Sequence, residues 1–335
     1  MTGVDARGPV FDDPGVLRTP LCGLLGIDVP IVSAPFGPWE QVELAAAVSA
    51  AGGLGSLGTG LRSADELRAQ WTRMRALTDR PFAVNHTMRP FDERAFQATL
   101  EAHPPAISFH LGVPADLIRR AHDNGILWVQ QVIDRSQAEE AVAAGADVII
   151  AQGGEAGGHS GRVATTVLVP QVVDLAGDIP VVAAGGIADG RGLAAALALG
   201  AQGVSMGTRF LASAELRIDD AWKRRVVEAD ALDAVKVANS DRVLPPYSRP
   251  VTEAEPRALR TPLIDQLREH PEWIEPRAVG PRVRAAVLAG GGHEYLPFAG
   301  QSAGLVHDVL PAAEIVRRVV AEAEEALAAA AAVRA

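Results

Sequence analysis

The stretch DVIIAQGGEAGGHSG, residues 147–161, joins a short apolar run to a loop with five glycines, one glutamate and one histidine. The run within Asp147–Ala151 does not alternate between apolar and polar residues, which indicates a strand buried on both faces, as in a parallel sheet. The glycines give the backbone unusual freedom directly after that strand. The stretch therefore predicts a parallel β/α fold with a specialised loop at the carboxyl end of one strand.

The same unit recurs along the chain, as an apolar run, a break with Gly, Pro or Asn, and a helical pattern. The eight runs predicted as strands are Val29–Pro35, Leu54–Gly60, Phe82–Asn85, Ala106–Leu111, Leu127–Ile133, Asp147–Ala151, Pro180–Ala184 and Gly203–Met206. Eight β–α steps at a spacing of about 25 residues favour the α/β class and a closed (β/α)8 TIM barrel. An open doubly wound sheet is the alternative, but Ala34-Pro35-Phe36-Gly37 after the first strand lacks the GxGxxG pattern of that fold.

The regular pattern ends after residue 210, where the chain becomes charged and rich in proline. We expect residues 211–281 to form an inserted lid or small subdomain after strand 8, with helices near 219–231 and 262–268. The barrel would then consist of residues 20–210 and 282–330. A helix from about Pro311 would pack as the eighth barrel helix, and residues 1–19 would be an N-terminal extension.

Composition limits the classes of function. The 335 residues carry a formal net charge of −10 and no basic cluster, which argues against nucleic acid as the main partner. The chain has no secretory signal pattern and no apolar run of the roughly 20 residues that span a bilayer, so we expect a cytoplasmic protein without membrane contact. Cys22 is the only cysteine, which excludes an intrachain disulfide and a cysteine-based metal site. The sequence does not distinguish a monomer from a homodimer.

Active sites of TIM barrels lie at the carboxyl ends of the strands, so the residues that follow each apolar run should form one rim. These residues are Ala34–Phe36, Gly58–Gly60, Asn85 and His86, His110, Gln130 and Gln131, Gln152–His159, Gly185 and Gly186, and Gly207–Arg209. The rim is rich in glycine and poor in acids, so it lacks the clustered His, Asp and Glu of a metal site. Loops after the last two strands of such barrels often bind phosphate through backbone N–H groups.

These two loops resemble those of flavin mononucleotide (FMN) barrels, and the chain resembles the nitronate monooxygenase family, formerly called 2-nitropropane dioxygenases. The resemblance covers about residues 20–212, with a weaker echo at Gly300–Gly304. It rests on Ala34-Pro35, Asn85, the stretch 151–161, Ala184-Gly-Gly-Ile187 and Met206-Gly-Thr-Arg-Phe210. Related flavin barrels, including an enoyl-acyl-carrier-protein reductase type, share much of this pattern, so it indicates the cofactor more firmly than the substrate.

The resemblance implies FMN as the cofactor and His159 as the catalytic base. The residues expected at the cofactor are Ala34, Pro35, Phe36, Asn85, Gln131, Gln152, Gly157, Gly185, Gly186, Ser205, Met206, Gly207 and Thr208. Many relatives carry methionine in place of Phe36 and glutamine in place of Ser205. Glu155 is expected to accept hydrogen bonds that stabilise its loop, whereas His86 and His110 could either line the pocket or serve the structure.

The implied reaction is the oxidation of alkyl nitronates, and of nitroalkanes, by O2 to carbonyl compounds and nitrite. A neutral imidazole with a pKa near about 6.5 can take a proton from the carbon beside a nitro group. One alternative is an NAD(P)H-dependent FMN reductase that acts on an enoyl thioester or quinone. Another is a flavin-binding protein without turnover, against which the intact His159 counts.

Overall fold

The computed structural model describes residues 17–88, 91–244, 254–289 and 291–333. Within these residues, eight parallel strands follow the order β1-β9-β8-β6-β5-β4-β3-β2. Their bounds are β1 Ile31–Ser33, β2 Gly55–Gly58, β3 Phe82–Thr87, β4 Ala106–His110, β5 Leu127–Val132, β6 Val148–Gln152, β8 Val181–Ala184 and β9 Gly203–Met206. A parallel bridge between Val32 and Leu54 joins the two ends of this sheet. The predicted (β/α)8 TIM barrel is therefore confirmed, and each predicted strand overlaps an observed one.

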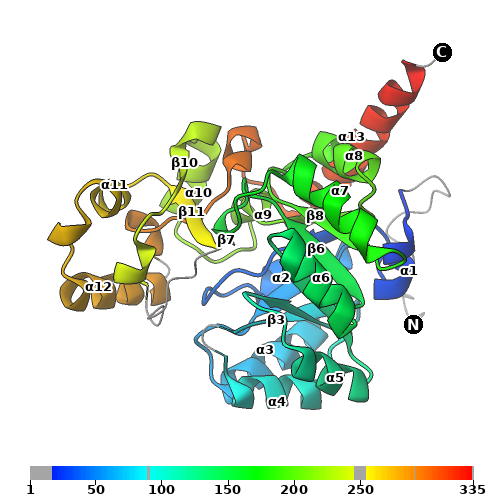
Figure 1. Cartoon of the computed structure of the whole chain (residues 1–335), viewed down its shortest axis with the longest axis horizontal. Helices are drawn as coiled ribbons and strands as arrows, with labels where there is room; N and C mark the ends of the chain where they lie inside the picture. The colour runs from blue at the N-terminus through cyan, green and yellow to red at the C-terminus, as the bar shows by residue number, and fades with distance from the viewer. Residues whose placement is uncertain (1–16, 89–90, 245–253, 290, 334–335) are drawn as a thin grey trace, which may run out of the picture.

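Helices cover the outside of the barrel (Figure 1). Their bounds are α1 Pro20–Leu25, α2 Val42–Ala50, α3 Ala64–Leu77, α4 Glu93–Ala102, α5 Ala115–Asp123, α6 Arg135–Ala144, α7 Thr165–Ala176, α8 Gly190–Ala198 and α13 Ala312–Ala332. Helix α3 begins with a capping box of Ser63 and Glu66, as the sequence pattern predicts. Helix α13 packs against α8 and α2, and the Glu322 carboxylate accepts a hydrogen bond from the Gly190 amide. The prediction of α13 as the last barrel helix is confirmed.

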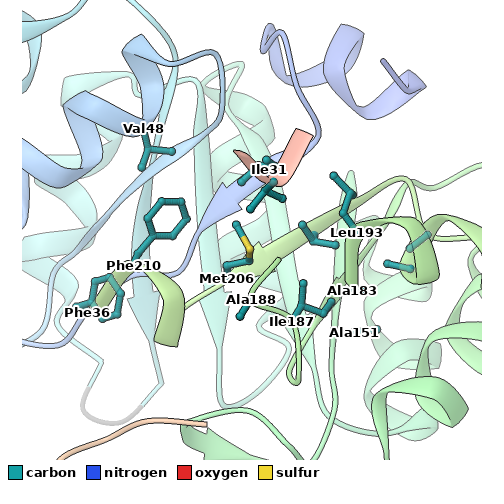
Figure 2. Packing of buried hydrophobic residues seen from close by; sticks show 14 of the residues in the cluster. Ile31, Phe36, Val48, Ala151, Ala183, Ile187, Ala188, Leu193, Met206 and Phe210 are labelled. Carbon is teal, nitrogen blue, oxygen red and sulfur yellow. The ribbon is translucent and has the colours of Figure 1, made fainter. Parts of the chain in front are cut away.

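Alternate residues of one strand enter different parts of the core, as the pleat of a strand requires. Val148 and Ile150 of β6 pack inside the barrel with Leu21 of α1, while Ile149 and Ala151 pack in the layer between strands and helices. Figure 2 shows part of that second layer. Because α1 packs against Gly203 at the start of β9, it covers the amino ends of the strands. The carboxyl ends are therefore the mouth of the barrel.

The segment between β9 and α13 forms a lobe beside the barrel (Figure 1). Its elements are α9 Thr208–Leu211, α10 Asp220–Glu228, η1 Ala231–Asp233, β10 Ala234–Lys236, η2 Ser240–Arg242, β11 Glu255–Leu259, α11 Pro262–Glu269, η3 Pro271–Trp273, α12 Pro276–Leu288, η4 Gly292–Glu294 and η5 Gln301–Leu305. Helices α10 and α11 match the two expected helices. A second sheet, β10-β11-β7, joins the lobe to β7, Gly158–Ser160, in the loop after β6.

The sequence analysis predicted neither β10 and β11 nor β7. Strand β7 pairs antiparallel with β11, which is remote in sequence. Strand β11 also pairs antiparallel with β10, which precedes it in the same lobe. A role of residues 211–281 as a lid stays a prediction. No helix in the described part of the chain is long and apolar enough to cross a membrane.

Candidate active site

The barrel mouth gathers amide side chains from neighbouring strands. Asn85 of β3 donates from Nδ2 to the Ser108 hydroxyl of β4 over 3.0 Å. Gln131 of β5 donates from Nε2 to Oε1 of Gln152, at the end of β6, over 3.1 Å. Gln131 and Gln152 are partly exposed and Asn85 is buried. The structure therefore places these three predicted residues at the rim, where amide groups can both donate and accept hydrogen bonds.

The tips of β8 and β9 lie next to each other. Ala184 pairs with Ser205 in register, so the chain continues from neighbouring strands, about 4.8 Å apart, into Gly185-Gly186 and into Gly207-Thr208. Gly185 and Gly186 have φ of +98° and +74°, a left-handed conformation that side chains disfavour. The Thr208 hydroxyl oxygen accepts a hydrogen bond of 2.8 Å from the Gly300 amide, which leaves its proton free of that bond. The two loops are thus close enough to hold a single anion.

Glu155, the only acid between Gln152 and His159, is turned toward helix α7. Its carboxylate accepts hydrogen bonds from the Thr165 amide, at 3.0 and 3.1 Å, and from the Thr165 hydroxyl, at 2.9 Å. This confirms the prediction that Glu155 is an acceptor that stabilises its loop.

Gly157 and Gly300 bring two distant backbone segments into direct contact. A Cβ at Gly157 would lie 2.6 Å from the Gly300 amide nitrogen, and a Cβ at Gly300 would lie 2.7 Å from the Glu155 carbonyl oxygen. The Gln301 amide donates to that same oxygen over 2.9 Å. The segment Gly300–Gly304, where the sequence resembles the family more weakly, therefore packs against the loop that carries His159.

His159 lies in the centre of strand β7, opposite Pro256 of β11. The glycine-rich pattern predicts a loop at this position, but residues 158–160 form a strand because they pair with β11, which is remote in sequence. Its ring centroid is 6.4 Å from that of Phe298. Burial, together with the nearby His110 and Lys236, lowers the pKa of His159 to about 4. The imidazole is therefore neutral at neutral pH.

His110 and His86 have different positions. His110 ends β4, and burial lowers its pKa to about 4; it is close enough to act on the pKa of His159. The structure thus brings to the mouth a second histidine whose role the sequence left open. His86 is buried, with Nδ1 3.3 Å from the Thr59 hydroxyl and Nε2 2.9 Å from the Thr99 hydroxyl, so it serves the structure.

The loop after β1 is held by backbone contacts. The Ala34 amide donates to the Met206 carbonyl oxygen over 2.9 Å, and the Gln41 side chain bonds both the amide and the carbonyl of Phe36. Pro35 between them is partly exposed. The side chains of Phe36 and Met206 belong to the core layer of Figure 2. Contact of these residues with a cofactor stays a prediction.

Three histidines with lowered pKa values, one buried and two half-buried, lead us to predict that the fold loses stability in mild acid. Burial lowers the pKa of His86 to about 3, and those of His110 and His159 to about 4, from 6.5. Below the unfolded-state value, the unfolded chain binds protons that the folded chain excludes, so the free energy of unfolding falls as the pH drops from 6.5 toward 4. Urea unfolding at about pH 7.5 and about pH 5 measures this fall. His86→Gln should show a smaller fall, and equal free energies at both pH values would contradict the prediction.

The fold and the candidate site define a class: a TIM barrel with glycine-rich loops at the mouth beside a neutral histidine. Comparison with known proteins gives the family. The family model described as "Nitronate monooxygenase" matches residues 18–95 and 87–322. The chain therefore belongs to the nitronate monooxygenase family and is a flavin-dependent oxidoreductase, which confirms the resemblance noted in the sequence.

Individual relatives carry different names. A nitronate monooxygenase of Paraburkholderia phytofirmans is 34% identical over 92% of this chain and 95% of its own length. The (3aS,4S,5R,7aS)-5-hydroxy-7a-methyl-1-oxo-octahydro-1H-indene-4-carboxyl-CoA dehydrogenase of Mycobacterium tuberculosis is 41% identical over 75% of this chain and 68% of its own. The solved structure of FabK from Thermotoga maritima superimposes with a TM-score of 0.84 at 36% identity, over 94% of this chain and 99% of its own.

Proposed function

We propose that the protein is an FMN-dependent enzyme that oxidises alkyl nitronates, and nitroalkanes, with O2 to carbonyl compounds and nitrite. The observation that carries this proposal is a neutral His159, on the strand that follows β6, at the mouth of a barrel whose last two strands lead into glycine-containing loops. Family membership and the end-to-end match to a relative named nitronate monooxygenase support the choice of reaction.

The residues at the mouth fit FMN. Gly185, Gly186, Gly207 and Thr208 would hold its phosphate, because the left-handed Gly185 and Gly186 let backbone amides approach an anion closely. Ser205, buried beneath these loops, would support them. The amide groups of Asn85, Gln131 and Gln152 would bond the polar edge of the ring system. Bound there, FMN supplies the electron transfer and the reaction with O2.

His159 is neutral at neutral pH, and a neutral imidazole can act as the base toward an uncharged nitroalkane. A neutral imidazole can accept the proton of the carbon beside a nitro group. The resulting nitronate is an anion, and an opposite charge nearby raises the pKa of an imidazole. The protonated His159 would then pair with the nitronate, so one residue both removes the proton and holds the product of that step.

The rim opposite the phosphate loops is partly apolar. In the closed strand order, β3 and β4 lie across the barrel from β8 and β9. Met88 follows β3 and is 42% exposed, and Leu61 follows the neighbouring strand β2 and is 52% exposed. Leu61 and Leu111 both have φ of +62°, an uncommon conformation for leucine that occurs most often at functional sites. This side of the mouth would receive the hydrocarbon part of the substrate.

A second candidate function is oxidation or reduction at the carbon beside a thioester carbonyl. The relative named carboxyl-CoA dehydrogenase supports it, because it is more identical to this chain than the nitronate monooxygenase is. A thioester activates its neighbouring carbon as an acid, so the same base and cofactor would serve.

Anaerobic reduction of the bound flavin distinguishes these functions. The FMN-loaded protein is mixed in parallel with an alkyl nitronate, its parent nitroalkane, a saturated acyl-CoA, an enoyl-CoA and NAD(P)H, and the absorbance of oxidised flavin is followed. The proposal predicts bleaching by the nitronate and nitroalkane, and nitrite on readmission of O2. Bleaching by the acyl-CoA or NAD(P)H alone would support the thioester enzyme, and no bleaching by any compound would support a flavin-binding protein without turnover.

A further inference from the structure

The lobe between β9 and α13 builds two of the three strands that hold His159. In the sheet β10-β11-β7, β11 pairs with β7 so that Pro256 faces His159, Glu255 faces Ser160 and Arg257 faces Gly158. The segment that carries the imidazole is thus an edge strand of a sheet that belongs mainly to the lobe. Its position depends on what ties β7 to the other two strands.

Lys236, the last residue of β10, makes the densest set of these ties. Its Nζ lies 2.8 Å from both the carbonyl oxygen and the hydroxyl of Ser160, 2.9 Å from the Gly161 carbonyl oxygen and 2.9 Å from the Glu255 carbonyl oxygen. An ammonium has three protons to donate, and four acceptors lie within hydrogen-bond distance, so each proton has an acceptor. The Ser160 hydroxyl in turn donates to the Ala156 carbonyl oxygen over 3.0 Å. Lys236 therefore holds the end of the loop that bears His159, and Ser160 links that end back to Ala156.

Arg257 holds an earlier part of the same loop. Its guanidinium donates to the Gly154 carbonyl oxygen from Nε at 3.2 Å and Nη2 at 2.9 Å, and to the Ala234 carbonyl oxygen at 2.6 Å. Arg257 thus ties the start of the loop to β10, and Lys236 ties its end. Of the two cations, Lys236 is the one whose charge acts on the pKa of His159.

We propose that Lys236 is a positioning residue for His159, fixing strand β7 to the lobe and thereby the imidazole to the barrel mouth. This inference rests on the role of His159 in the proposed function. It gives residues 211–281 a part in the reaction, because the lobe then supplies the support of the base. Taking an ammonium out of water is costly unless its donors are satisfied, and here backbone oxygens satisfy them.

The charges around both groups define the expected pH dependence. Burial, with Arg257 and Arg162 and against the opposing effect of Glu255, lowers the pKa of Lys236 to about 8. His159 faces His110 from β4 and Lys236 from β10, and both lower its pKa beyond the effect of burial. Lys236 is therefore charged at neutral pH and favours the neutral imidazole. Loss of that charge should raise the pKa of His159.

The test compares Lys236→Met with Lys223→Met. Lys223 of α10 is the only other lysine in the sequence; it is also buried, and its Nζ makes a bond of 3.4 Å to the Ala214 carbonyl oxygen. Histidine titration is followed by NMR on the FMN-loaded protein, with the His159 signal assigned by its loss in His159→Asn. Lys236→Met should raise the pKa of His159 and lower kcat for the nitroalkane about 10-fold or more. Lys223→Met should change neither, and Lys236→Arg should restore the pKa of His159 but only part of kcat.

An unchanged His159 titration in folded Lys236→Met would overturn the proposal. If that variant does not fold, 13C-labelled lysine in the wild-type protein gives two side-chain signals, one for each lysine. One should titrate near pH 8, and the His159 signal should shift over the same pH range. Absence of that shared step would also overturn the proposal. The NMR titration does not require the protein to turn over a substrate. If the protein does not oxidise nitronates, that result counts against the proposed function, and the titration still decides the role of Lys236.

Discussion

Replacing His159 with asparagine should leave FMN bound and slow the oxidation of a neutral nitroalkane by about 10²-fold or more. Asparagine keeps a polar side chain of similar size on β7, between Gly158 and Ser160, so the strand and its pairing with Pro256 should persist. It cannot accept a proton at neutral pH, so only the proton transfer is lost. Anaerobic reduction of the flavin by nitroethane, followed by stopped-flow absorbance, measures the change.

The preformed nitronate provides the internal comparison for this variant. Its carbon has already lost the proton, so His159→Asn should slow its oxidation far less than that of the nitroalkane. His122→Asn is a control on the outside of the barrel, where the imidazole contacts the Asp147 carboxylate over 2.8 Å, and it should behave as the wild type does. Equal rates with nitroalkane in His159→Asn and wild type would remove this residue from the chemistry.

Replacing Gly157 with alanine should abolish tight FMN binding and lower the free energy of unfolding by about 1–3 kcal/mol. The new Cβ would lie 2.6 Å from both the Ala299 carbonyl carbon and the Gly300 amide nitrogen. Both are backbone atoms, so no side-chain rotation can relieve the overlap. The Gly300 amide also donates to the Thr208 hydroxyl, so its displacement would disturb the expected phosphate site. Flavin fluorescence titration and urea unfolding measure the two effects.

Gly60→Ala is the matched control for this substitution. Gly60 lies at the same rim after β2, a Cβ there would meet no atom within 4 Å, and its φ is not left-handed. We expect FMN affinity and stability close to those of the wild type. Tight FMN binding in a stable Gly157→Ala protein would show that the contact between the two backbone segments does not matter for the cofactor.

The barrel could be predicted from the sequence because its strands are buried on both faces. Runs such as Val148–Ala151 leave no polar alternation to confuse with an exposed strand, and Gly or Asn marks their ends. The loop that carries His159 was also evident, because five glycines around one histidine are uncommon after a buried strand. Helix α13 followed from the need to cover the last strands of a closed barrel.

The support of His159 could not be predicted in the same way. Strand β7 is three residues long and pairs with Glu255–Arg257, about a hundred residues further along the chain, so no local pattern marks it. In the sequence, nothing distinguishes Lys236 from a charged surface residue. Only the fold brings the backbone oxygens of Ser160 and Glu255 to its ammonium group. His110 stands at a strand end, where the strand register decides whether the ring enters the mouth.

A crystal structure of the FMN complex tests the central claim most directly. The account predicts the phosphate in hydrogen-bond contact with the backbone at Gly185–Gly186 and Gly207–Thr208, and the His159 imidazole facing the isoalloxazine ring. A phosphate bound away from the tips of β8 and β9, or a His159 side chain directed out of the barrel mouth, would contradict it.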